Sequence, residues 1–445
     1  MKHNRYSKAL VAIYTVLVVG MPAVVNAQAE KNISLPEAIN LSIKSSGQLK
    51  IANYKVTEAI AAYHQAKENQ LPDLKTSGSY MRLDNPNVNL KVKLGSSSGT
   101  SQAKPVTVNE LSYAMVNASV PVFSGFRLHY GIESARYLEE AAKLDVQNQK
   151  ELLIQNTIGA YCNLYKAQKS VELVKKNLKQ QDIRVADFAN LEKNGVLAYN
   201  DLLKARLQQS NTELALMDAE NNLKITRVNM SLMLGLPENT ELVADSASFQ
   251  TIGDAGIISE WEGKAFQQRT DIKSLTYHEK ASVTAIKSIK GEYFPGLAFT
   301  GGYVAANIPG LLTITNAINF GLGLQYNIGS IWKTSAKLDA AKARLSEVQV
   351  TENMLADQIR MEVNQAYENY LLSLRKIEVY NKAKEQAAEN YRISKNKYEN
   401  KLMTITDLLD ADLAQLQVDL NIAYSKADAL FAYKKLQQTA GVLAE

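Results

Sequence analysis

The chain is an internal duplication, and this constrains its fold more than any other feature. The segment Leu71–Tyr80 is matched by Phe294–Tyr303, 223 positions later, and Asp201–Gln209 is matched by Asp407–Gln415, 206 positions later. The shorter second offset means that the first half carries 17 extra residues, within the Ser-, Gly- and Asn-rich segment Asp84–Glu110. A duplicated chain builds the same elements twice. We therefore expect two equivalent halves, with a longer loop in the first.

A leader precedes the first half. Lys2, Arg5 and Lys8 are followed by the apolar run Ala9–Gly20 and by the small residues of Ala27-Gln28-Ala29. This order is typical of a secretory signal peptide. The expected domain plan is a signal peptide, a first repeat, an inter-repeat linker and a second repeat, at 1–29, 30–236, 237–260 and 261–445. Each repeat should contain a helix, a strand–loop–strand unit and a long helical hairpin.

Each half also contains strands with a strict period of two. Apolar and polar residues alternate from Ile318 to Ile328 and again from Val116 to Val122, which predicts strands with one apolar face. A half-buried strand of a soluble sandwich is one explanation. About 9–11 residues is also the length of a tilted strand that crosses a bilayer. Four such strands in a secreted chain favour the membrane, with Asp84–Glu110 and Ala305–Ala317 as loops outside the cell.

The rest of each half is strongly helical. There is no glycine or proline from Ile331 to Ala440, and no proline from Phe126 to Leu234. Only turns at Asn194-Gly195 and Asn400-Lys401 interrupt these stretches, so we expect descending helices of about 65–70 residues, roughly 100 Å long. Apolar residues recur at steps of three and four, as in coiled-coil seams: Ala160, Leu164, Ala167, Val171, Val174 and Leu178, then Leu409, Leu413, Leu416, Leu420, Ala423, Ala427 and Leu430.

Composition argues against an enzyme or a metalloprotein. The only cysteine is Cys162, and four scattered histidines offer no zinc-type cluster, so we expect no metal and no cofactor. No nucleophile, acid–base pair or phosphate loop is apparent either. The formal charge of +5 falls to +2 without the three leader cations, and such a charge gives no reason to expect nucleic-acid binding.

The element order and the second hairpin tip, Tyr398–Ala411, resemble the outer-membrane efflux protein family, whose members are TolC-like channels. The resemblance implies a mainly α chain with a membrane β-barrel, in which each protomer supplies four transmembrane strands and long coiled-coil helices. It implies a homotrimer with a 12-stranded barrel on an α-helical periplasmic tunnel. It further implies a periplasmic adaptor (a membrane fusion protein), an inner-membrane pump of the RND or ABC class, and outer-membrane lipid as partners.

Elementary physics agrees with this implication. Backbone groups in lipid must all be hydrogen-bonded, so strands cross a membrane only as closed barrels. Four strands cannot close a barrel, whereas three copies of four strands can, and cyclic symmetry provides the closure. The expected function is the passive outer-membrane exit duct of a tripartite efflux or type I secretion system. The alternative is a periplasmic coiled-coil adaptor or scaffold without a barrel, which explains the helices but not the strands.

The family resemblance also assigns the tips. It implies a periplasmic gate at Tyr398, Met403, Asp407 and Asp410, where Met403 replaces a basic residue of the family. It implies adaptor-docking tips at Asn194, Gly195, Val196 and Leu197 in the first half and at Asn400, Lys401 and Leu402 in the second. The alternative for the two aspartates is an ordinary solvated helix face.

Overall fold

The computed structural model describes residues 30–84, 86, 108–250 and 253–443. The expected signal peptide and most of the loop Asp84–Glu110 lie outside the described residues. The chain forms two compact units, each of which combines segments of both sequence repeats. One unit contains the sheet with residues 47–152, 257–365 and 437–445, and the other contains the hairpin tips with residues 1–46, 153–256 and 366–436. We call them the sheet unit and the tip unit.

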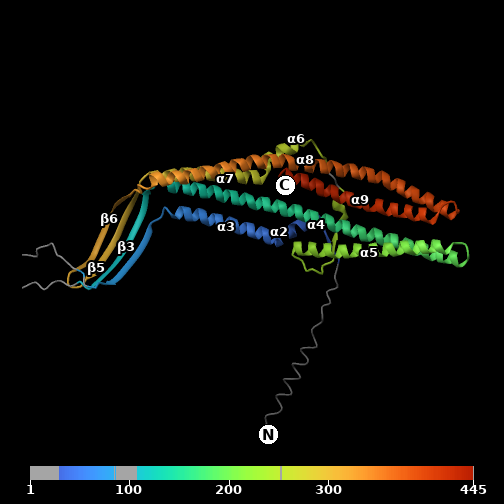
Figure 1. The fold of residues 1–445 in the computed structure, drawn as a ribbon, viewed down its shortest axis with the longest axis horizontal. Helices are drawn as coiled ribbons and strands as arrows, with labels where there is room; N and C mark the ends of the chain where they lie inside the picture. Colours follow the sequence, from blue (N-terminus) through green and yellow to red (C-terminus); the bar gives the residue numbers. More distant parts are fainter. Residues whose placement is uncertain (1–29, 85, 87–107, 251–252, 444–445) are drawn as a thin grey trace, which may run out of the picture. The chain divides into compact units, whose positions relative to one another are not determined.

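The sheet unit contains all four predicted strands in one antiparallel sheet (Figure 1). The strands run in the order β2-β3-β5-β6, and the two halves meet where β3 pairs with β5. The three strand pairs are continuous except for irregularities at Pro121–Phe123 and Val304–Ala306, and within the described residues β2 and β6 each lack a partner on one side. Their bounds are Asp73–Arg82 for β2, Glu110–Phe123 for β3, Gly296–Ile308 for β5 and Leu312–Gln325 for β6.

One loop prediction was wrong. Ala305–Ala317 is not a long loop, because β5 continues to Ile308 and β6 begins at Leu312. Gly310 adopts a φ of 76°, and the amide of Leu311 donates to the carbonyl oxygen of Ile308 at 3.0 Å. A tight Pro-Gly turn therefore suffices, and the β-forming residues on both sides extend the two strands.

Apolar side chains cover one face of β6. Phe320 is 81% exposed, and its neighbours on the same face are also exposed: Ile318, Leu322 and Leu324. The opposite face is polar or small, and the side-chain oxygens of Asn117 and Asn319 both lie beside Gly302. The predicted alternation is confirmed, and the apolar face has no cover within the described residues.

Helices in the sheet unit repeat at the same offset as its strands. The short helix α6 (Ile258–Gln268) corresponds to α2 (Leu35–Ser45), which lies in the tip unit, at a shift of 223. The longer α7 (Thr270–Lys290) corresponds to α3 (Gly47–Glu68) at the same shift. At the α6–α7 junction, the guanidinium of Arg269 donates to Glu362 at 2.7 Å and to the carbonyl oxygen of Thr439 at 3.2 Å. This buried arginine fixes the end of the chain to the sheet unit.

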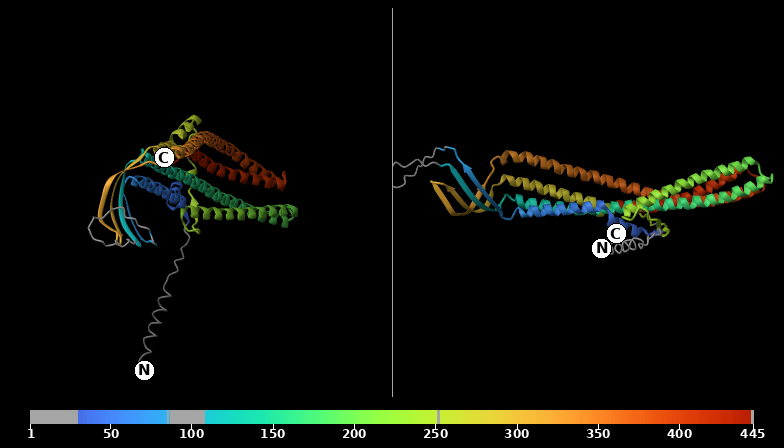
Figure 2. Two further views of the ribbon diagram at one scale, coloured as in Figure 1. Left: turned by 60° about the vertical axis from the view of Figure 1, so that its left-hand side comes forward. Right: turned by 90° about the horizontal axis from the view of Figure 1, so that it is seen from below.

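Two helices run through both units. They are α4 (Arg127–Lys193), of 67 residues, and α8 (Ser330–Glu399), of 70 residues, so the predicted length is confirmed. In the tip unit they are followed by α5 (Tyr199–Leu234) and α9 (Ile405–Thr439), and each pair of helices forms a hairpin (Figure 2). None of the helices in the described residues combines the length and the hydrophobicity that a bilayer crossing needs.

A small parallel sheet anchors the base of the tip unit. Strand β1 (Lys31–Ile33) pairs with β4 (Leu242–Ala244), and the hydroxyl of Tyr161 on α4 donates to the carbonyl oxygen of Ile33 at 3.0 Å. The α4 seam is buried at Leu164, Ala167 and Val174. Cys162 is buried beside this seam, and burial raises the pKa of its thiol to about 12. It behaves as a small core residue, as its sequence context indicated.

Candidate docking and gating site at the hairpin tips

The two hairpin turns have the same backbone geometry. At the first, the amide of Val196 donates to the carbonyl oxygen of Leu191 at 2.9 Å, and Gly195 has a φ of 71°. At the second, Leu402 donates in the same way at 2.8 Å to Lys397, and Lys401 has a φ of 61°. Both are glycine-type helix ends. Lys401 thus occupies the left-handed conformation that its repeat partner Gly195 adopts without a side-chain cost.

Replacing Lys401 by glycine is expected to stabilise the second tip. A lysine pays about 1 kcal/mol for a left-handed backbone, and glycine removes most of that cost. The free energy of unfolding, measured by denaturant titration, should rise by about 0.5–1 kcal/mol. The matched change Asn400→Gly is the control, because Asn400 lies beside Lys401 but has no positive φ and should lose stability instead. A loss of stability in Lys401→Gly would show that the turn does not strain the lysine.

The predicted docking residues are largely exposed. Val196 is 55% exposed and Leu402 is 77% exposed, one at each turn. The side chains of Asn194 and Asn400 bond back to the carbonyl oxygens of Asn190 and Asn396, both at 2.8 Å. The turns are therefore closed by their own asparagines, and an apolar side chain is left pointing outward at each. Leu197 differs, because it packs against the core of the tip.

That core joins the two hairpins inside the tip unit. Its buried members come from α4, α5 and α9, and two tyrosines of α8 pack against it: Phe188, Leu202, Ala205, Ile405, Leu408 and Leu409, with Tyr391 and Tyr398. Burial of Leu408 and Leu409 turns the residues on either side of them, Asp407 and Asp410, to the surface. Both carboxylates of the predicted gate are therefore exposed on α9.

Asp407 also caps the start of α9. Its carboxylate accepts from the hydroxyl of Thr404 at 2.7 Å and from the backbone amide of Thr404 at 3.3 Å. In return, the hydroxyl of Thr404 accepts from the amide of Asp407 at 3.3 Å. This reciprocal pair is a capping box at the start of α9. The first hairpin has Ala198 at the equivalent position and makes no side-chain cap.

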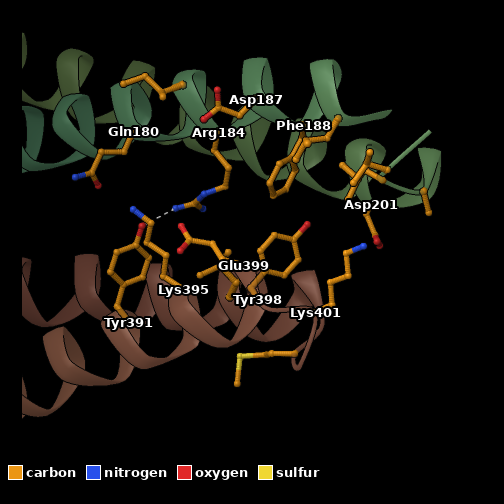
Figure 3. Close-up of a pocket in the computed structure, with 17 residues that line it drawn as sticks. Gln180, Arg184, Asp187, Phe188, Asp201, Tyr391, Lys395, Tyr398, Glu399 and Lys401 are labelled. Carbon is orange, nitrogen blue, oxygen red and sulfur yellow. Dashed lines mark hydrogen bonds between the residues drawn. The ribbon is translucent and has the colours of Figure 1, made fainter. Parts of the chain in front are cut away.

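Tyr398 and Met403 lie in a groove instead. The groove of about 780 Å³ runs between the hairpins (Figure 3). Within it, the rings of Tyr398 and Phe188 are 5.5 Å apart. Burial, and then the nearby carboxylate of Asp201, raise the pKa of the Tyr398 phenol, so it remains a neutral hydrogen-bond donor. Asp407 and Asp410 are not among the lining residues, so the groove holds only two of the four predicted gate residues.

Sequence reasoning missed a buried ionic cluster beside this groove. Arg184 on α4 donates to the carboxylate of Asp412 at 3.0 Å and to the hydroxyl of Tyr391 at 3.1 Å, and Asn177 donates to Asp412 at 3.4 Å. Asp412 is almost fully buried. The sequence does contain a signal for this cluster. Asp412 lies seven positions after Ile405 and so falls on the buried side of α9, where a charge rarely occurs without a partner. The cluster connects α4, α8 and α9.

The comparison with family models decides the identity. The model of the outer membrane efflux protein family matches residues 38–236 and 261–442, most of the chain and both repeats. The chain belongs to this family. As an outer membrane efflux protein it is located in the outer membrane and forms the exit duct of a tripartite efflux system, in which an adaptor and a pump take part. The comparison with curated protein sequences gave no match.

Solved structures show the same fold. The chain is similar to the outer membrane protein VceC of Vibrio cholerae at 16% identity and a TM-score of 0.75, covering 92% of this chain and 96% of that one. It is similar to the CmeC outer membrane channel of Campylobacter jejuni at 16% identity and a TM-score of 0.77, covering 92% and 86%. The open state of the Neisseria gonorrhoeae MtrE channel has 19% identity and a TM-score of 0.69, with 92% and 89% covered.

Proposed function

We propose that three copies of this outer membrane efflux protein close a 12-stranded barrel above an α-helical periplasmic tunnel. In this assembly the tips dock onto a periplasmic adaptor fed by an inner-membrane pump of the RND or ABC class. The duct conducts substrates passively, with no catalytic residue and no cofactor. The domain plan of two repeats joined by a linker at 237–260 belongs to the same proposal.

The open sheet is the observation that carries the proposal. The outer strands β2 and β6 each leave one edge unpaired within the described residues, and β6 exposes an apolar face from Ile318 to Leu324. Unpaired backbone groups are costly in lipid, and an apolar face is costly in water. Pairing the β6 edge of one copy with the β2 edge of the next would satisfy the backbone groups once three copies close the ring, and lipid around the closed ring would cover the apolar face.

Apolar side chains on α5 support contact between copies. Six large non-aromatic ones are exposed along this helix at spacings that keep them near one face: Leu203, Leu207, Leu214, Met217, Ile225 and Leu232. A seam of this kind is the usual signature of a helix packed against another helix. Within the tip unit the opposite side of α5 is already packed, with Leu202 and Ala205 in the core. A helix of a neighbouring copy would cover the exposed seam.

The tips carry the two remaining parts of the proposal. The docking surface consists of Asn194, Gly195, Val196 and Leu197 with Asn400, Lys401 and Leu402, and its exposed apolar residues fit an adaptor contact. The gate consists of Asp407 and Asp410, which would form two carboxylate rings around the threefold axis, and of Tyr398 and Met403 behind them.

A charge on the lipid-facing side of β6 tests the barrel. Leu322→Lys is expected to abolish insertion into the outer membrane, because a lysine near the bilayer midplane costs about 2–4 kcal/mol in each copy. Asn319→Lys is the matched control, since it adds the same charge to the opposite, polar face. Detergent-extractable protein in the membrane fraction is measured. Equal insertion of the two variants would favour a periplasmic scaffold, which salt would also wash from the membrane.

A further inference from the structure

We propose that the strand–helix junction of the sheet unit binds the phosphate headgroup of anionic phospholipids in the periplasmic leaflet of the outer membrane. The junction is the region where β3 ends and α4 begins, beside the end of α7 (Figure 1). Its residues are Phe123, Phe126, Arg127, Tyr130, Lys287, Lys290 and Phe294. The inference rests on the proposed barrel, which would place this junction at the membrane surface.

The backbone holds the junction rigidly. Gly125 has a φ of 64° and lies against the carbonyl of Gly291, so that a side chain on either glycine would collide with the other segment. The hydroxyl of Ser288 on α7 donates to the carbonyl oxygen of Arg127 at 3.0 Å. Phe126, between these anchors, has a φ of 65°. A bulky residue in that conformation is strained, and such strain persists where the surrounding structure enforces it and tends to mark functional sites.

Strain at Phe126 places an aromatic ring where it is not buried. Phe126 is 60% exposed. Its ring lies 5.6 Å from that of Phe123, edge to face, and 6.5 Å from that of Tyr130. Phe294 is exposed beside Gly125. A cluster of exposed rings is unfavourable in a water-filled lumen, whereas aromatic residues are enriched at the level of lipid headgroups.

Three cations belong to the same junction. Arg127, Lys287 and Lys290 are exposed, and the ammonium of Lys287 lies 5.6 Å from the centre of the Tyr130 ring. Glu292, two residues after Lys290, is already engaged by Lys337 at 2.7 Å and by Thr334 at 3.3 Å, and Glu133 on α4 accepts from the hydroxyl of Tyr137 at 3.0 Å. Within the described residues, no carboxylate forms an ion pair with the three cations. The junction therefore offers three exposed cations that are not held in ion pairs within the described residues.

Rings and charges together select the ligand. Free phosphate would bind to the cations alone and would leave the exposed aromatic rings without a role. A phospholipid satisfies both, because its acyl chains receive the rings while its phosphate accepts charge-assisted hydrogen bonds from arginine and lysine. A headgroup with a net negative charge, such as that of phosphatidylglycerol, is preferred over zwitterionic phosphatidylethanolamine, since the ammonium of the latter would be repelled.

Tryptophan quenching tests this preference. Trp332 is 64% exposed at the start of α8, two residues before Thr334, which bonds to Glu292. The full protein is placed in vesicles of equal parts phosphatidylglycerol and phosphatidylethanolamine, with brominated acyl chains on only one of the two lipids. We expect brominated phosphatidylglycerol to quench about twofold more than brominated phosphatidylethanolamine. The junction variant combines three substitutions, Arg127→Gln, Lys287→Gln and Lys290→Gln. In this variant the two brominated lipids should quench the tryptophan fluorescence equally.

The matched control removes the same charge elsewhere. Lys175→Gln, Lys176→Gln and Lys179→Gln change three exposed lysines of α4 in the tip unit and should keep the twofold preference. Trp332→Phe should remove the lipid-dependent signal, because Trp261 is buried. Equal quenching in the unchanged protein, or an unchanged preference in the junction variant, would overturn the inference. Absence of quenching by either lipid would instead contradict the proposed barrel.

Discussion

Replacing Gly195 by aspartate is expected to abolish export while leaving the protein folded and assembled. The left-handed φ of Gly195 is tolerated by aspartate at a cost of about 1 kcal/mol, and no atom lies within 4 Å of the position that a Cβ would occupy. The fold therefore has room for the new side chain. The proposed docking contact would not accommodate it, because a carboxylate beside Val196 would have to lose its hydration in an apolar contact.

The measurement for Gly195→Asp is the minimum inhibitory concentration of an exported compound in cells that depend on this duct. It should fall to the level of cells without the protein, while the amount of assembled protein in the membrane stays unchanged. Gly195→Asn is the control, since asparagine adopts the same backbone conformation without a charge, and it should retain substantial export. Normal export by the Gly195→Asp variant would show that Gly195 does not belong to the proposed docking surface.

Neutralising the two exposed aspartates of α9 is expected to reduce the cation selectivity of the open channel. Asp407 and Asp410 lie three residues apart and hence on the same side of the helix, so three copies would present six carboxylates in a narrow lumen. Such rings attract cations strongly and let multivalent cations plug the pore from the periplasmic side. Met403 supplies no positive charge that could form an ion pair with the carboxylates in a closed state. We therefore expect the resting channel to conduct ions.

Single-channel recording in planar bilayers compares the unchanged protein with Asp407→Asn plus Asp410→Asn. The reversal potential should shift toward zero, and the block by multivalent cations should weaken at least tenfold. Asparagine keeps an oxygen that accepts from Thr404, so the capping box survives and assembly should not change. Asp218→Asn plus Glu220→Gln removes equal charge from α5 and is the control. An unaltered reversal potential and blocking affinity would mean that the carboxylates face away from the lumen.

Much of the fold follows from sequence patterns. The duplication fixed the order of elements, the absence of glycine and proline indicated the lengths of α4 and α8, and strict alternation located β3 and β6. The span Ala305–Ala317 is not a long loop because Pro309-Gly310 makes a tight turn and the β-propensity of residues such as Leu312 and Ile314 extends the strand beside it. Strand ends depend on such local competition, which periodicity alone does not resolve.

The site was only partly predictable. The first exposed turn follows from Gly195 within a helical stretch, the second follows from its repeat relation to the first, and the Thr404-x-x-Asp407 capping box is itself a sequence motif. The ion pair between Arg184 and Asp412 could not be predicted from the sequence. The residues are 228 positions apart, and their contact depends on how α4 and α9 pack. The groove, which Tyr398 lines and Asp407 does not, likewise depends on packing between the hairpins.

The mass of the particle extracted from the outer membrane tests the central claim most directly. Membranes are washed with high salt, solubilised in a mild neutral detergent, and the protein is weighed by native mass spectrometry. A closed duct built from four strands per copy predicts a particle of three chains that remains in the membrane pellet until detergent is added. A single chain in the detergent extract, or recovery of the protein in the salt wash, would contradict the account.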